Sequence, residues 1–134
     1  MVRAKISISC LAMGLLSLSP AVRAAVSDDN FLVKTTGDLV ALCSADPADK
    51  MMTAATNFCH GFVVGTYRVL SEQQSASRNK LFCPPATLPS RNEAIARFVT
   101  WAKANSAAAT LSPTDGMLKY LMERFPCPAK QASH

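Results

Sequence analysis

Cys59 and His60 stand next to each other, and this thiol and imidazole are the closest that the sequence comes to a catalytic pair. A thiol protease needs an imidazole that faces the thiol, whereas adjacent residues of a helix point in different directions. Cys59 is also needed for a disulfide, as argued below. We therefore expect His60 to be a surface or packed histidine and not a catalytic base.

The carboxylates do not form a paired acid and base either. Those from which such a pair would be drawn are Asp38, Asp46, Asp49, Glu72, Glu93, Asp115 and Glu123. Four of them occupy positions that begin predicted helices, namely Asp46, Asp49, Glu93 and Asp115. The sequence has no G-x-S-x-G motif, phosphate-binding loop or metal-ligand spacing. It predicts neither an enzyme nor a bound cofactor or metal.

Four methionines could suggest copper binding, because soft thioethers suit that metal. They are Met51, Met52, Met117 and Met122. All four recur at helical spacing on or near predicted core faces. We expect them to fill the core and not to bind a metal.

The first 24 residues have the pattern of a cleavable signal peptide. Arg3 and Lys5 supply positive charge, an apolar run extends over residues 6–18, and small or modest residues precede a cut near Ala24. The run is shorter than the roughly 20 residues of a membrane span, and no later segment is long and apolar enough to be one. We predict that residues 25–134 form a domain exported from the cytoplasm.

Removal of this segment takes Cys10 with it and leaves four of the five cysteines. The four are Cys43, Cys59, Cys83 and Cys127. An even number in a small exported domain indicates two disulfides. None of them forms a C-x-x-C pair, and only His60 and His134 could add ligands, so zinc binding or redox chemistry has less support.

Arg3, Lys5 and Arg23 are three of the 14 basic residues, so 11 basic residues remain against 9 acidic ones, a net charge of +2. The remaining basic residues are scattered and form no dense stripe, which argues against a nucleic-acid partner. The length of the exported part suits one domain with one core.

Hydrophobic spacing is helical almost everywhere, and no alternating run is long enough for a sheet. We predict an all-α domain of four helices, over residues 36–43, 47–70, 90–104 and 112–125. Their expected caps are Thr36, Asp46, Ser90 and Ser112, and Glu93 would complete a capping box with Ser90. A proline-rich turn over 83–89 and a small-residue loop over 105–111 separate the last three.

Each of the three longer helices has a predicted buried face. On the second helix it comprises Met51, Ala55, Phe58, Phe62, Thr66 and Val69. On the third it comprises Ile95, Phe98, Val99 and Ala102, with Trp101 on or beside it. On the fourth it comprises Leu118, Leu121, Met122 and Phe125. These faces would form one core.

The connectivity of the disulfides can be argued in part. A short loop should make the third and fourth helices antiparallel neighbours, which brings Cys127 towards Cys83. The remaining pair, Cys43 with Cys59, requires the first helix to cross the second, because Cys59 would lie about 18 Å along the second helix. We prefer this connectivity, and the two other pairings remain open.

Gly61 and Gly65 lie four residues apart and would form a flat strip on the long helix. Glycine costs about 1 kcal/mol in a helix interior, so the close approach of another helix would be a reasonable compensation. That helix could belong to the same domain, which we favour, or to a second subunit.

Four basic residues lie in or near the connection over 71–80 and the turn over 84–89. They are Arg68, Arg78, Lys80 and Arg91. They could meet an acidic rim on a partner protein or be ordinary solvated surface.

An ordered set of short motifs resembles the Rap1a/Tai family of immunity proteins associated with bacterial type VI secretion. The motifs are Gly37–Cys43, Cys59–Gly65, Phe82–Pro85, a helix that ends near Ala104–Asn105, and Phe125–Cys127. Each motif alone is short, but the ordered set of motifs spans nearly the whole part of the chain that we expect to be exported. The four cysteines and the signal peptide add to the resemblance.

The resemblance implies a helical, disulfide-bonded periplasmic protein, often a homodimer, that has no catalysis of its own. Such proteins bind a peptidoglycan amidase effector and block it sterically, with a protruding element in its active-site cleft. The loop over 105–111 departs from this, because it lacks the aromatic residues and arginine that dominate tight interfaces. The alternatives are a periplasmic helical binding or chaperone-like module with no toxin partner and, third, a small exported hydrolase.

Overall fold

The computed structural model describes residues 25–128, so the predicted signal peptide over 1–24 lies outside the described residues. The elements are η1 (Asp28–Leu32), α1 (Thr36–Cys43), α2 (Met52–Ser75), α3 (Arg91–Ala104), η2 (Ser106–Thr110) and α4 (Pro113–Arg124). The predicted all-α fold of four α-helices is confirmed, and residues 25–128 contain no strand. No helix in this part of the chain has the length and apolar character needed to cross a membrane.

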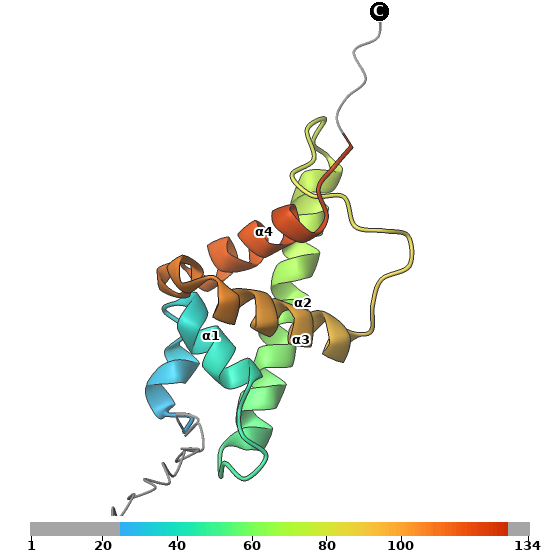
Figure 1. The fold of residues 1–134 in the computed structure, drawn as a ribbon. Coiled ribbons are helices and arrows are strands. Elements are labelled where there is room, and N and C mark those ends of the chain that lie inside the picture. The colour runs from blue at the N-terminus through green and yellow to red at the C-terminus, as the bar shows by residue number, and fades with distance from the viewer. Residues whose placement is uncertain (1–24, 129–134) are drawn as a thin grey trace, which may run out of the picture.

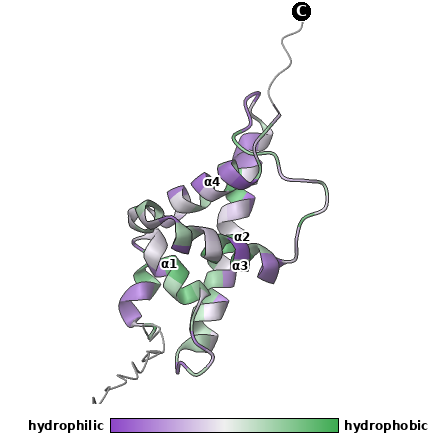
Figure 2. Cartoon of the chain, in the orientation of Figure 1, coloured by the Kyte–Doolittle hydropathy of each residue, from purple (hydrophilic) through white to green (hydrophobic). Residues whose placement is uncertain are grey.

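The long helix α2 organises the domain, with α1, α3 and α4 lying across one side of it (Figure 1). The short helix α1 contacts all three other α-helices and is the most hydrophobic of the four in Figure 2. Its Leu39 and Leu42 are fully buried. The core therefore lies between α1, one face of α2, and the inner faces of α3 and α4.

The helix caps follow local chemistry that was visible in the sequence, with one shift. Ser90 accepts a hydrogen bond from the backbone of Glu93, and Ser112 accepts one from the backbone of Asp115, as predicted. The cap of α1 is Thr35 and not Thr36. The Thr35 hydroxyl accepts from the backbone of Asp38, whose carboxylate accepts from the Thr35 backbone at 2.9 Å.

Asp38 is held in its charged form by this cap. Burial raises the pKa of Asp38, but hydrogen bonds from the Thr35 side chain, the Asn30 amide and the Thr35 backbone outweigh burial. The net pKa lies below the usual value of an aspartate. The ionised carboxylate thereby ties η1 to the first turn of α1, since Asn30 donates to it at 3.1 Å.

The predicted start of the second helix was wrong. Asp46 comes directly before a turn that includes Pro47, and α2 begins only at Met52. Asp46 accepts from the backbone of Ala48 at 2.9 Å, and Asp49 accepts from the backbones of Met51 and Val26, each at 2.8 Å. Such local side-chain bonds compete with the helix for backbone donors. At its other end α2 continues to Ser75, so the polar run that begins at residue 71 extends the helix instead of ending it.

Two predicted helix faces are confirmed only in part: Ala55 on α2 and Leu121 on α4 are buried as predicted, but other members of each face are exposed. On α2 the fully buried residues are Ala55 and Cys59, whereas Phe58 and Val69 are 37% and 53% exposed. On α4, Met122 is 42% exposed. The buried residues of α4 are Pro113, Gly116, Met117, Tyr120 and Leu121. Apolar side chains occupy more than one face of both helices, so periodicity alone does not select the face that contacts the core. The predicted face of α3 is confirmed at Ile95, Phe98 and Ala102.

The start of α1 meets the start of α4 at a close contact between Thr36 and Gly116. Thr36 is fully buried, and its hydroxyl donates to the carbonyls of Leu111 and Ser112 at 3.2 and 3.0 Å. A Cβ atom at Gly116 would clash with Thr36 Oγ1 and lie 2.8 Å from its Cγ2. Only glycine leaves room for the threonine here.

We predict that Gly116→Ala lowers the free energy of unfolding by about 1–3 kcal/mol, the usual range for an overpacked core. Urea denaturation followed by circular dichroism measures the change. Gly61→Ala, measured at a protein concentration low enough for monomers, is the matched control, because no atom of the same chain lies within 4 Å of a Cβ at that position. The control should leave stability unchanged or raise it by up to about 1 kcal/mol. Equal effects of the two substitutions would contradict the contact.

Candidate functional site

Both preferred disulfides are present. Cys43 joins Cys59 with their Cα atoms 5.2 Å apart, and Cys83 joins Cys127 with a Cα separation of 4.8 Å. The first bond holds α1 across α2, as the pairing required. Cys59 therefore has no free thiol, which leaves no nucleophile beside His60.

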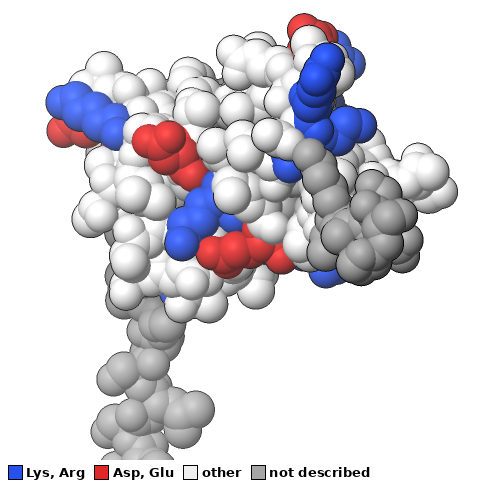
Figure 3. Space-filling view, turned by 90° about the horizontal axis from the view of Figure 1, so that it is seen from above, with Lys and Arg blue, Asp and Glu red and all other residues white. Residues whose placement is uncertain are grey.

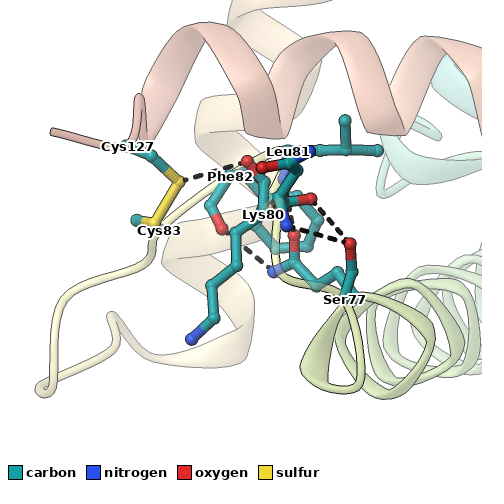
Figure 4. Close-up of a disulfide and its surroundings, with 8 residues drawn as sticks. Ser77, Lys80, Leu81, Phe82, Cys83 and Cys127 are labelled. Atoms are coloured by element: carbon teal, nitrogen blue, oxygen red, sulfur yellow. Dashed lines mark hydrogen bonds between the residues drawn. A yellow bond between two sulfur atoms is a disulfide. The ribbon is translucent and has the colours of Figure 1, made fainter. Parts of the chain in front are cut away.

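The second disulfide fixes the start of the loop over 83–90 to the end of α4 (Figure 4). The backbone of Cys83 donates to the carbonyl of Phe125 at 2.7 Å. Gln74, near the end of α2, accepts from the backbones of Leu81 and Phe82 and donates to the Phe82 carbonyl at 2.9 Å. Phe82 is itself buried, so the loop begins at a firmly held point.

An apolar cavity of about 270 Å³ lies where this loop faces the helices. Its walls come from α2, α3, the end of α4, and Leu88 and Pro89 of the loop. Its aliphatic and aromatic walls include Val64, Tyr67, Phe98, Tyr120, Leu121 and Phe125. No Asp or Glu is among the residues that line it.

Three arginines also line this cavity, from two different helices. Arg97 pairs with Glu93 one turn earlier on α3, whereas Arg68 and Arg91 form no ion pair with any residue of 25–128. Of the four predicted partner-binding residues, the structure thus brings Arg68 and Arg91 to one cavity. It does not bring Arg78 or Lys80 there; both follow α2 on the connection to the loop.

Two tyrosines add polar groups to the same apolar walls. Tyr120 is 7% exposed, and its hydroxyl has no hydrogen-bond partner within the described part of the chain. Burial raises the pKa of Tyr120, and the positive charges of Arg124 and Arg97 oppose this increase. Tyr67 likewise contributes a hydroxyl without a partner among residues 25–128. A tyrosine hydroxyl can donate one hydrogen bond and accept others.

The histidine and the carboxylates considered in the sequence analysis do not come together in one site. Among residues 25–128, no group of three or more His, Cys, Asp or Glu residues could hold a metal ion. His60 lines a separate, shallower hollow with Thr56, Asn92 and Lys103. Glu123 accepts hydrogen bonds from Trp101 and Lys119, which hold its pKa below the usual value despite some burial.

The glycine strip on α2 faces open space. A Cβ at Gly61 or Gly65 would have no atom within 4 Å, so the prediction of a packed helix of the same domain was wrong. The partly exposed Phe58 and the exposed Val69 lie on the same side of the helix. This strip is part of the uncovered side of α2, because α1, α3 and α4 contact the other side.

The charges on the face seen from above are mixed (Figure 3). Most of this face is uncharged, basic and acidic side chains lie beside each other in small groups, and basic ones gather more densely at one edge. No single-sign field covers this face, in agreement with the small net charge expected for the exported part.

Sequence reasoning did not identify the two tyrosines or the cavity. The spacing of Gly116, Met117, Tyr120 and Leu121 is helical and could have indicated the inner face of α4. No sequence signal indicates the cavity, because four separate segments form it.

We predict that the longer disulfide loop contributes more stability. Replacing Cys83 and Cys127 by alanine should lower the free energy of unfolding by about 4 kcal/mol, and replacing Cys43 and Cys59 by about 3 kcal/mol. The loops that these bonds close span 44 and 16 residues, and a longer loop loses more entropy in the unfolded chain. Urea denaturation of the two double variants tests the order. Non-reducing peptide mapping of the parent chain should recover the same pairs.

Comparison with known protein families gives a match. The family model described as Rap1a immunity proteins matches residues 35–127, which is well over half of the chain. The matched region begins at the cap of α1 and ends at the last cysteine. No curated protein and no solved structure matches significantly.

Proposed function

This chain belongs to the Rap1a immunity protein family, and we propose that it acts in the periplasm, where it binds a secreted effector and blocks it sterically. We further propose that the effector is a peptidoglycan amidase delivered by type VI secretion. The family match over nearly the whole described domain is the observation that carries this proposal.

The two disulfides support a location outside the cytoplasm. Disulfides persist in oxidising compartments such as the periplasm and are rare in the cytosol. The signal-peptide pattern over residues 1–24 points to the same compartment, where peptidoglycan lies.

The unpaired arginines support a protein partner. Arginine and aromatic side chains supply much of the binding energy in protein interfaces. Arg68 and Arg91 lie with Tyr67 and Phe125 around one cavity. The segment over 105–111 is less suited to this role, because it forms η2, contacts α1 and α3, and buries Ala108 completely.

We predict that the full chain, expressed with its own N-terminal segment, protects cells against a periplasmic amidase of this class. Cells that produce the amidase alone should lyse, and cells that also produce the chain should grow and yield a complex of the two on purification. A variant that lacks residues 2–24 is the matched control and should not protect, because it stays in the cytoplasm. If the exported chain neither binds nor protects against any of a panel of such amidases, the immunity proposal is wrong and a binding or chaperone-like role replaces it.

A second copy of the chain is the partner that we propose for the glycine strip. The exposed Phe58 and Val69 flank a surface that a second helix could approach closely at Gly61 and Gly65. Natural homodimers most often pair such identical patches around a two-fold axis.

We predict that the exported chain purified from the periplasm sediments as a dimer and that Gly65→Arg makes it a monomer. Thr100→Arg on the exposed side of α3 is the matched control and should leave the dimer intact. Analytical ultracentrifugation over a range of concentrations measures the equilibrium. A parent chain that stays monomeric at high concentration would refute the dimer.

A further inference from the structure

We infer that the cavity between α2, α3, α4 and the loop over 83–90 receives one large apolar side chain of the effector, flanked in the effector by a carboxylate. This inference rests on the proposed function, because it takes the effector as the partner. It assigns the surface that makes the contact and the chemistry of the segment that fills it.

The size of the cavity suits a single side chain. Its volume is about 270 Å³. Pockets for drug-sized ligands and cofactors hold about 300–1,000 Å³. The cavity lies just below this range, and an apolar pocket of this size can receive one interface anchor.

The walls favour an aromatic or large aliphatic anchor. Phe98 and Tyr120 meet edge to face, with ring centroids 5.5 Å apart and planes at 69°. Trp101 adds a third ring to this cluster, 5.5 Å from Tyr120. An inserted ring would extend a set of aromatic contacts that already has favourable geometry.

The charges at the cavity call for an anionic flank on the partner. Arg68 and Arg91 lack a carboxylate within the described residues, and no acidic side chain lines the cavity. Guanidinium groups bind carboxylates through paired hydrogen bonds, which are stronger than neutral ones. The unpartnered hydroxyl of the buried Tyr120 is a further donor for a carboxylate or carbonyl oxygen.

The first test uses peptides, so that it does not depend on knowing the effector. The probe is the acetylated, amidated tripeptide Asp-Phe-Glu, and its matched controls are Asn-Phe-Gln and Asp-Ala-Glu. Titration of the full, oxidised chain followed by NMR should show binding of the probe about tenfold or more tighter than either control. Shifts should centre on the resonances of Tyr67, Ala94 and Tyr120.

Variants of the chain assign the binding to the cavity. Arg68→Glu with Arg91→Glu should abolish probe binding, and Ala94→Trp should do the same by filling the space. Arg78→Glu with Lys80→Glu makes the same charge change away from the cavity and should leave probe binding intact. Unchanged circular dichroism spectra and melting temperatures would show that the variants remain folded. Equal binding of the three peptides, or loss of binding in the Arg78 and Lys80 variant alone, would overturn the inference.

The second test uses an amidase that the chain binds in the protection assay. The double variant Arg68→Glu with Arg91→Glu should raise the dissociation constant of that complex about 100-fold or more. The control variant Arg78→Glu with Lys80→Glu should raise it less than about threefold.

The outcomes separate the two proposals. If the parent binds the amidase and both variants bind equally well, the cavity inference fails while the immunity function stands. If no amidase binds but the acidic aromatic peptide does, the immunity function fails while the cavity remains a peptide site. If sodium laurate binds the cavity more tightly than the peptide, the cavity is a small-molecule site and the inference is overturned.

Discussion

The helix α1 is eight residues long, shorter than helices that persist alone in water, and the bond from Cys43 to Cys59 holds it across α2. This crossing places Leu39 and Leu42 in the centre of the domain, where they are fully buried. It also presents Thr36 to Gly116, so that the first turns of α1 and α4 meet. Because α1 contacts α2, α3 and α4, this covalent constraint places the helix against which all the others pack.

Because α1, α3 and α4 all lie on one side of α2, only that side of the long helix is buried. The residues of α2 that face the core are small at Ala55 and Cys59, where α1 is close, and larger at Tyr67 and Leu70, where α4 lies. Towards the end of α2 the helices no longer fill the space completely. The loop over 83–90 covers this space only in part. The space that remains is the cavity lined by the arginines and the two tyrosines.

Local chemistry and connectivity explain why much of the fold could be predicted. Ser90 and Ser112 cap their helices as expected, because a serine hydroxyl satisfies a free backbone donor wherever a helix begins. The preference for pairing Cys83 with Cys127, which is confirmed, came from a short loop that makes two helices neighbours. The start of α2 could not be predicted correctly, because the turn around Asp46 and Asp49 is itself well bonded. The face of α2 was misjudged because Phe58 and Val69 are as apolar as the residues that face the core. The convergence of Arg68 and Arg91 depends on how three helices and a loop meet, which residue spacing does not encode.

The attachment of the loop over 83–90 to the segment after α4 depends on the redox state of the chain. When Cys83 and Cys127 are reduced, the start of the loop is held by the backbone bond of Cys83 to Phe125 and by the contacts of Gln74 with Phe82. Leu88 and Pro89, which form one wall of the cavity, then lose the covalent constraint that precedes them in the chain. Disulfides persist in oxidising compartments such as the periplasm and are rare in the cytosol. If the chain is exported as proposed, its cavity would therefore acquire this constraint only outside the cytoplasm.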